Sequence, residues 1–312
     1  MEPLFLVLMA FLMEIKALKV RLYPTEAQAV LLEKHFGANR FVWNYFLQKR
    51  TDYYAGSKNR GKPHGLNYFQ TTKLLTELKR EREWLYEISN ATLQQTLRKL
   101  DNAFTAFFRK NNNYPNFRSK KGKQYFVVPE NAKSEANRLF LPKFREGIRF
   151  RDKHKLPENI KQVVVTRSVG RYYASIIYDT DEVMEKGHEE MGVDVGIKTF
   201  ATLSNGIQIE NPHLLKKLEG KVKKAQRGLS RKQKGSRNSG KQIVRIQKLY
   251  RKITDSRDDF LHKVSSAIAK RSGTIVMEDL NVQGMMHNHN LAKSIGDVSW
   301  YRFKEMLRYK AE

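Results

Sequence analysis

The sequence has 312 residues, of which 59 are Lys or Arg and 32 are Asp or Glu, so its formal net charge is +27. A chain this basic repels itself unless polyanions bind to it, which favours nucleic acid as the partner. The alternative is a ribosomal protein or a membrane-surface protein. Because the sequence contains no Cys, disulfides and thiolate zinc sites are excluded, which fits a reducing cytosol. The expected location is the cytoplasm, in association with the nucleoid.

The chain begins with an apolar run, Leu4–Met13, that is too short to span a bilayer. Its leader carries Glu2 where a secretory signal peptide carries basic residues. From Met13 the sequence MEIKALKVRLYPT alternates apolar and charged residues, which predicts a strand. We therefore interpret residues 1–12 as an upstream extension and Met13 as the true start, with a short membrane anchor as the alternative.

Three helices are predicted after this strand. Thr25 caps the first, which runs to about Arg50, and the others extend from about Asn67 to Arg82 and from Asn90 to Lys110. Aromatic and Leu residues at helical spacing in the third helix are expected to form a core. A helix-turn-helix motif is not favoured, because any small set of three helices suggests one.

The hydrophobic period changes between Tyr114 and Tyr178, where short segments separated by Gly, Pro and charged turns predict strands. A small β-barrel or a curled sheet with one charged face fits this region. Its basic side chains, taken as a set, favour contact with nucleic acid over ordinary solvated lysines. They are Arg118, Lys120, Lys121, Lys123, Lys143, Arg145, Arg149, Arg151, Lys153, Lys155, Arg167 and Arg171.

After an acidic linker that ends near Glu190, the segment MGVDVGIKTFATLSNGIQIE predicts a strand, a tight turn and a second strand. The stretch Lys216–Lys252 then contains 15 Lys or Arg and one acid, so its net charge is +14. A long helix is expected to overlap this stretch and to run to about Arg271, where Gly273 stops it, and TIVMEDL predicts a buried strand. The residues expected to contact backbone phosphates are Lys223, Lys224, Arg227, Arg231, Lys232, Lys234, Arg237 and Lys241.

Two acids, Asp194 in MGVDVG and Glu278 in IVMEDL, sit in apolar strand-like segments. Burying a carboxylate is costly unless it is paired or binds a metal, and hydrolysis of phosphodiesters by Mg²⁺ needs carboxylates that converge. We therefore predict that Asp194 and Glu278 share a metal site; the alternative for each is a strand-end acid that faces solvent. Asp279 should point to the opposite face of its strand and is not assigned to the metal.

Two other patterns are rejected. The letters HNHN, with His287 and His289, lie too close together for an HNH nuclease and are interpreted as a solvated loop. No Gly-rich run opens a helix with Gly-Lys-Ser/Thr, so no phosphate-binding P-loop is predicted.

The segments around the two acids carry a specific resemblance. GVDVGIKTFATLSNG is similar to the first RuvC motif of the TnpB (OrfB) family, and IVMEDLNVQGMM is similar to the second. Between them, LSRKQKGSRNSGK and ITDSRDDFLHKVS resemble the basic helical segment of the same family, and KVRLYPT and RFVWNYFL resemble its N-terminal region. The resemblance extends from about Met13 to the end of the chain.

This resemblance implies an α+β multidomain fold, with an N-terminal β-barrel (wedge-like), an inserted helical bundle and an incomplete RuvC/ribonuclease H-like α/β domain. It implies an RNA-guided DNA endonuclease encoded beside transposons, with guide RNA and target DNA as partners. Asp194 and Glu278 would be the catalytic ligands of Mg²⁺ or Mn²⁺. No zinc is expected in this chain, because the sequence contains no Cys. The implied boundaries are 1–12 (extension), 13–24 (first wedge strand), 25–112 (recognition-like helices), 113–186 (wedge-like β-domain) and 187–312 (partial RuvC-like domain).

The sequence departs from the family pattern at its C-terminal end. The family continues with a four-Cys zinc ribbon and a third RuvC motif that supplies another Asp, whereas this sequence stops at RFKEMLRYKAE. Asp297 lies in a segment that resembles the helix after the second motif, so it is not assigned to the metal. We therefore expect impaired DNA cleavage, and two alternatives stay open: a nuclease-inactive RNA-guided DNA-binding repressor and a plain RNA-binding protein.

Overall fold

In a computed structural model of the chain, the structure describes residues 14–59, 61, 64–151, 156, 159–180 and 187–311. The interpretation of residues 1–12 and Met13 lies outside the described residues. The chain divides into two compact units, one within Met1–Val183 and the other within Met184–Glu312. Among the described residues, no helix is both long enough and apolar enough to cross a membrane.

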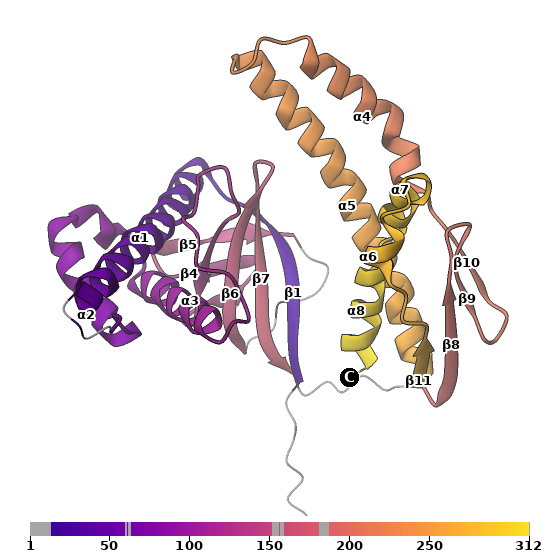
Figure 1. The fold of residues 1–312 in the computed structure, drawn as a ribbon, viewed down its shortest axis with the longest axis horizontal. Helices are drawn as coiled ribbons and strands as arrows, with labels where there is room; N and C mark the ends of the chain where they lie inside the picture. The colour runs from indigo at the N-terminus through magenta and orange to yellow at the C-terminus, as the bar shows by residue number, and fades with distance from the viewer. Residues whose placement is uncertain are drawn as a thin grey trace, which may run out of the picture. The chain divides into compact units, whose positions relative to one another are not determined.

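The first unit contains a seven-stranded antiparallel sheet with the order β2-β6-β7-β1-β5-β4-β3. Figure 1 shows β6, β7 and β1 of this sheet side by side. The N-terminal strand β1 lies in the middle of the sheet because it pairs along its length with β7 and at its end with β5. Within the described residues, β2 and β3 each have one paired neighbour, so the predicted barrel stays a prediction. The strands are β1 (Glu14–Tyr23), β2 (Gln124–Val128), β3 (Lys133–Glu135), β4 (Arg138–Leu141), β5 (Phe144–Phe150), β6 (Ile160–Ser168) and β7 (Arg171–Thr180).

Three α-helices and one 3₁₀ turn are inserted between β1 and β2. Asn67 begins the second helix with a reciprocal capping box, in which its side chain and that of Gln70 accept each other's backbone N–H. Leu and Phe side chains spaced along the third helix pack against the other helices, as their spacing predicts. The elements are α1 (Glu26–Asn59), α2 (Tyr68–Glu81), η1 (Glu83–Glu87) and α3 (Asn90–Phe108).

The long helix α1 belongs to two hydrophobic cores at once. Its N-terminal half packs Leu32 and Phe36 against the sheet, whereas Val42 and Phe46 pack among the helices. His35 lies at this junction and is fully buried. Its ring lies against Phe126 and Phe144 of the sheet, its Nδ1 lies 2.9 Å from the Leu31 carbonyl oxygen, and its Nε2 accepts the Ser89 N–H at 3.4 Å.

We expect His35 to make the first unit sensitive to acid. Burial lowers the pKa of His35 from 6.5 to about 4, so the unfolded chain binds this proton more readily than the folded chain. The contribution of neutral His35 to the free energy of unfolding is fully present above pH 6.5 and is lost as the pH falls toward 4. At 1.36 kcal/mol for each unit of pKa difference, the loss reaches about 3 kcal/mol.

The measurement is urea unfolding between pH 7 and 4, followed by tryptophan fluorescence in a Trp300→Phe background, so that only Trp43 and Trp84 of the first unit report. Since carboxylates also titrate in this range, the decisive quantity is the difference between this protein and its His35→Gln variant. The same pH dependence in both proteins would contradict the expectation.

The second unit contains a four-stranded sheet with the order β10-β9-β8-β11, in which β8 and β11 run parallel. Helices cover one face of the sheet: Phe200 of β9 packs edge-on against Phe260 of α5 and Phe303 of α8, with ring centroids 4.8 and 4.9 Å away. The elements are β8 (Glu189–Val195), β9 (Thr199–Leu203), β10 (Gln208–Glu210), α4 (Leu214–Ser230), α5 (Arg237–Arg271), β11 (Ser272–Met277), α6 (Val282–Met285), α7 (His289–Val298) and α8 (Trp300–Ala311).

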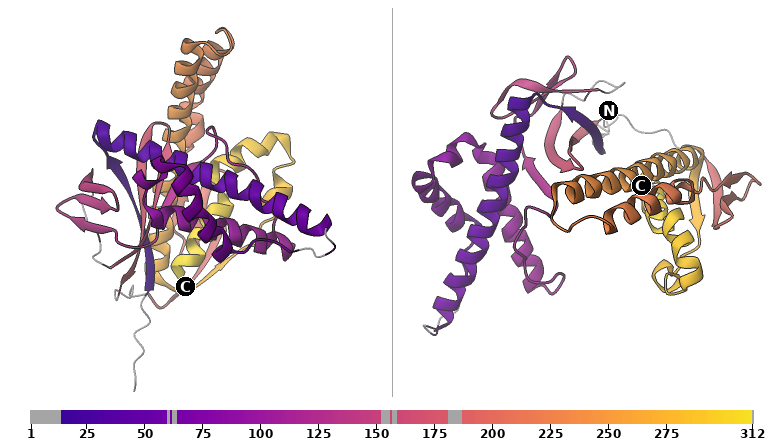
Figure 2. Two further views of the ribbon diagram at one scale, coloured as in Figure 1. Left: turned by 90° about the vertical axis from the view of Figure 1, so that its left-hand side faces the viewer. Right: turned by 90° about the horizontal axis from the view of Figure 1, so that it is seen from above.

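The basic stretch forms two helices rather than one. Helices α4 and α5 lie side by side as a hairpin (Figures 1 and 2), held by Gln242, whose Nε2 donates to the Ala225 carbonyl at 2.7 Å. Gly235, at φ +84°, turns the chain, and Ser236 then caps α5 by accepting the Ser239 N–H at 3.1 Å.

Three further predictions differ from the structure. Helix α1 continues past Arg50 to Asn59, because Arg50 pairs with Asp101 of α3 at 2.9 Å and holds this part of α1 in place. Gly273 does not stop α5, which passes directly into β11; a Cβ at this position would lie 3.0 Å from the Gly187 carbonyl oxygen, so glycine permits a close backbone approach. Strand β11 is an edge strand rather than a buried one, and its Val276 is 64% exposed.

Candidate active site and nucleic-acid interface

Asp194 lies on the uncovered face of the second sheet. Along β8, Met191 and Val193 are buried in the core beneath the helices, whereas Asp194 is exposed. Since side chains alternate between the faces of a strand, Asp194 faces away from that core. The residue is therefore held by a well-packed strand while its carboxylate stays accessible.

The parallel strand β11 brings Glu278 beside this position. The register pairs Val276 with Gly192 and Met277 with Val193. The residue after Met277 is Glu278, and the residue after Val193 is Asp194. Met277 and Val193 both pack in the same core, so the residues that follow them are directed to the opposite face. Glu278 is exposed and comes directly after the last residue of β11, not inside the strand as predicted.

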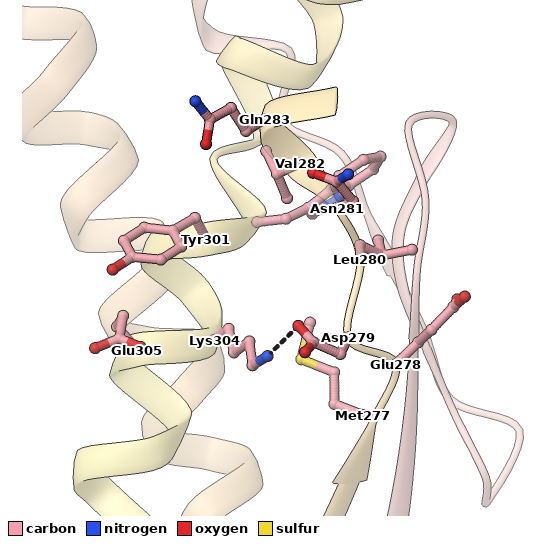
Figure 3. A pocket seen from close by; sticks show the side chains of 11 residues that line it. Met277, Glu278, Asp279, Leu280, Asn281, Val282, Gln283, Tyr301, Lys304 and Glu305 are labelled. Atoms are coloured by element: carbon pink, nitrogen blue, oxygen red, sulfur yellow. Dashed lines mark hydrogen bonds and ion pairs between the residues drawn. The ribbon is translucent and has the colours of Figure 1, made fainter. Parts of the chain in front are cut away.

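Asp279 points the other way. Figure 3 shows Glu278 directed away from α8, whereas Asp279 points toward Lys304 on that helix. The Lys304 ammonium lies 2.6 Å from the Asp279 carboxylate, and its hydrogen bond lowers the pKa of Asp279. A cavity of about 270 Å³ is lined on one side by Met277–Gln283 and on the other by α8 (Figure 3).

Asp194 and Glu278 have the donor chemistry of a hard-cation site. In the described part of the chain, neither carboxylate takes part in an ion pair or a side-chain hydrogen bond, so their oxygens are available. Mg²⁺ keeps several water ligands and needs only one or two carboxylates from a protein, so this pair fits it. No group of three or more His, Cys, Asp or Glu that could hold a metal was found among the described residues.

Two residues that support this site, Ser204 and Asn211, escaped the sequence analysis. Ser204 fixes the middle of β8, since its Oγ accepts the Gly192 N–H at 3.0 Å and its own N–H donates to the Gly192 carbonyl at 2.9 Å. Asn211 donates to the Ile197 carbonyl at 2.6 Å, in the turn that follows Asp194. The turn also requires Gly196, because a Cβ there would lie 2.8 Å from the Thr199 carbonyl oxygen. The turn sequences Gly-Ile-Lys-Thr and Ser-Asn-Gly were the sequence features that could have indicated these contacts.

Asp297 has a structural role in this unit. Its carboxylate accepts the Leu215 N–H at the start of α4 at 3.1 Å and pairs with Arg257 at 2.9 Å. Both partners occupy the oxygens that a metal ligand would need, so the geometry agrees with leaving Asp297 out of the metal site.

The predicted phosphate-contacting residues gather on the α4–α5 hairpin. All eight are exposed, and they lie on α4, on the turn between the helices and on the first turns of α5. In the described part of the chain, only Lys223 among them has an acidic partner, Glu219, at 2.7 Å. The others present uncompensated positive charge to solvent, and contact with nucleic acid stays a prediction.

Comparison with known proteins identifies the family. A family model described as "Probable transposase" matches residues 174–289, and a model described as "Helix-turn-helix domain" matches residues 13–59. A protein of Streptomyces pristinaespiralis named "Putative RNA-guided DNA endonuclease" is 37% identical over 303 residues, which cover 95% of this chain and 74% of that protein. The "Putative RNA-guided DNA endonuclease InsQ" of Escherichia coli (strain K12) is 33% identical over 319 residues, covering 95% of this chain and 77% of the relative.

This chain belongs to the TnpB (OrfB) family of transposases. The family match includes both Asp194 and Glu278, and the resemblance seen in the sequence is confirmed. Among solved structures, a "Cas12f1-sgRNA-target DNA complex" aligns over 96% of this chain and 87% of that chain, at 12% identity and a TM-score of 0.45, which is too low to establish a shared fold.

The segment of this TnpB-family chain that matches the helix-turn-helix family model does not have helix-turn-helix geometry in this structure. The described part of residues 13–59 forms one strand, β1, and one helix, α1. A helix-turn-helix motif needs two helices joined by a short turn, and α1 is continuous over Glu26–Asn59.

Proposed function

We propose that this TnpB-family chain is an RNA-guided DNA-binding protein with metal-dependent DNA endonuclease chemistry. The observation that carries the proposal is the parallel register of β8 and β11, which directs Asp194 and Glu278 to one exposed face. The names of two relatives, which align with 95% of this chain, support the same function.

In this proposal each part of the chain has a distinct role. Asp194 and Glu278 would hold Mg²⁺ or Mn²⁺, which when bound supplies Lewis-acid chemistry for phosphodiester hydrolysis. The basic residues of the α4–α5 hairpin bind backbone phosphates without reading sequence, and pairing between guide RNA and target DNA supplies the sequence specificity. The first unit would act as a wedge-like β-domain with inserted recognition-like helices, and the second as a RuvC-like domain.

A binding-only role is the second candidate. It is favoured by the observation that no group of three or more His, Cys, Asp or Glu side chains that could hold a metal occurs among the described residues. Such a protein would occlude its target DNA, as a repressor does, without cutting it.

The test begins with RNA that co-purifies with the chain. This RNA is sequenced, and labelled DNA complementary to it is added to the purified complex. We expect binding to matched DNA and its loss when mismatches are placed across the first ~10 nucleotides of the paired segment, where guided pairing nucleates. A complex that holds RNA but binds matched and scrambled DNA equally would reject guided DNA binding and favour a plain RNA-binding protein.

A further inference from the structure

Three cationic side chains surround one tyrosine ring in the first unit. The Nζ atoms of Lys99 and Lys123 lie 4.9 and 5.8 Å from the centroid of the Tyr125 ring, and the Cζ atom of Arg118 lies 4.9 Å from it. These residues come from α3, from the loop before β2 and from β2 itself. We call Lys99, Arg118, Lys123 and Tyr125 the Tyr125 cluster.

Arg118 is held rigidly at the centre of this cluster. Its guanidinium lies over the Trp43 ring, 3.5 Å from the centroid, and its Nη2 donates to the Tyr125 hydroxyl at 2.8 Å. The backbone on either side is pinned to α1: Asn44 accepts the Arg118 N–H at 2.8 Å and donates to its carbonyl at 2.9 Å. Trp43 also donates from Nε1 to the Asn116 carbonyl at 3.0 Å. The positive charge therefore has a fixed position, which lowers the entropic cost of binding an anion.

The charges in the cluster repel one another. None of its three cations has an acidic partner among the ion pairs of the described residues, and Arg40 adds a further guanidinium nearby through its hydrogen bond to Gln124, at 2.7 Å. Burial, followed by the charges of Arg118 and Lys123, lowers the pKa of Lys99. A bound anion would relieve this repulsion.

The surrounding loop carries features of a nucleic-acid surface. Lys120 and Lys121 are exposed in the same loop, and the Phe117 ring, directly before Arg118, is 59% exposed. Ordered cations that contact phosphates, next to an exposed aromatic ring on which a base can stack, are the combination found where proteins bind single strands.

We propose that the Tyr125 cluster binds the phosphodiester backbone of a single-stranded nucleic acid, with Phe117 stacking on one of its bases. The inference rests on the proposed function in its choice of nucleic acid as the ligand, and it adds a binding surface outside the α4–α5 hairpin. RNA and DNA share the phosphodiester, so separate arms of the experiment distinguish them.

The test compares two double variants of the full chain that each remove two positive charges. Lys99→Gln/Lys123→Gln removes the outer cations of the cluster. Lys19→Gln/Lys49→Gln is the matched control, since Lys19 and Lys49 each lie over a single tyrosine ring, at 5.4 and 5.7 Å from the centroids of Tyr173 and Tyr45. Affinity for labelled oligouridine, oligothymidine and duplex DNA is measured by fluorescence anisotropy over a range of salt concentrations.

We expect the cluster variant to reduce the slope of log affinity against log salt by about 1.4 for single strands, at ~0.7 for each phosphate that is no longer neutralised, and the control to leave it unchanged. Phe117→Ala should weaken single-strand binding roughly 5-fold or more and leave duplex binding unaltered, because stacking requires an unpaired base. Without nucleic acid, the melting temperature of the cluster variant should be no lower than that of the unmodified chain, because the repulsion among the three cations has been reduced. A lower melting temperature, which would indicate a structural role for these lysines, would count against the proposal.

The outcomes separate this proposal from the proposed function. The Tyr125 site would be overturned if the salt slope changed equally in the two double variants. It would also be overturned if the unmodified chain bound nucleic acid and the cluster variant showed no change in slope. Both results would leave the proposed function standing. Failure of the unmodified chain to bind any of the three ligands would overturn the proposed function as well. A slope change with the RNA oligomer, the DNA oligomer or both supports the site and identifies its strand.

Discussion

Asp194→Ala is expected to lower guide-dependent DNA cleavage by at least ~10²–10³-fold, the loss typical of removing one well-placed electrostatic stabiliser. Glu278→Gln should have the same effect, because the register of β8 and β11 directs both side chains to one face of the sheet. The measurement is single-turnover cleavage of matched DNA with Mg²⁺ or Mn²⁺. Asp279→Asn is the matched control: its carboxylate pairs with Lys304 on the other side of the strand, so the rate should be retained.

A metal-binding measurement tests the same site if the chain cleaves DNA too slowly for rates to be compared. For this chain we expect binding of target DNA with little cleavage. The two-metal route clamps both the attacking and the leaving oxygen, and no group of three or more His, Cys, Asp or Glu side chains that could hold a metal occurs among the described residues. Mn²⁺ binding, followed by calorimetry, should then be abolished in Asp194→Ala and kept in Asp279→Asn. Rapid cleavage that survives Asp194→Ala, or equal damage from Asp279→Asn, would show that the site has been misplaced.

The second large effect concerns salt. Affinity for duplex DNA should fall by ~10³–10⁵-fold between 50 and 200 mM salt if the chain neutralises roughly 6–10 phosphates. Replacing Arg231, Lys232 and Lys234 with Ala should reduce the salt slope by up to about 3, near 1 for each phosphate-binding side chain that is removed. These residues are exposed at the turn of the hairpin, and no acid partner offsets them among the described residues.

A matched triple variant controls for the change in net charge alone. Lys263, Arg302 and Lys304 of the same unit pair with Asp259, Asp258 and Asp279 at 2.6, 2.9 and 2.6 Å. Replacing these three with Ala removes the same charge from the chain but from sites already neutralised locally, so the salt slope should change little. Equal slopes for the two triple variants would mean that the hairpin is not a preferred surface for nucleic acid.

The sequence predicted elements whose signals are local. Helices α2 and α3 lie within two residues of their predicted bounds, because Asn67 and the apolar spacing of α3 act within a few residues. The hairpin was missed although Gly235 and Ser236 mark its turn, since the continuous run of basic residues on both sides suggested one helix. Strands β3 and β10 have three residues each, too few to show an alternating pattern.

The candidate site was predictable in residue type but not in geometry. Asp194 and Glu278 could be singled out because acids are costly in apolar strands, but their proximity depends on a parallel pairing across the whole of α4 and α5. Apolar residues such as Ile275 and Val276 suggested a buried strand, whereas burial depends on which elements cover each face. The Tyr125 cluster was predicted only in part. Arg118 and Lys123 were among the basic side chains expected to contact nucleic acid, but Lys99 belongs to a helix, and only the fold brings these residues to one ring.

The charge along α5 is divided, and this division limits the size of the ligand that the hairpin can hold. The basic side chains extend from Arg237 to Lys252, and the next turns carry Asp255, Asp258 and Asp259. At about 1.5 Å per residue the basic segment is about 22 Å long, equal to roughly 6 or 7 steps of a duplex at ~3.4 Å each. Oligonucleotides shorter than this footprint reach proportionally fewer of the cations, while longer ones gain nothing further from this helix, so affinity measured against duplex length should level off near that size.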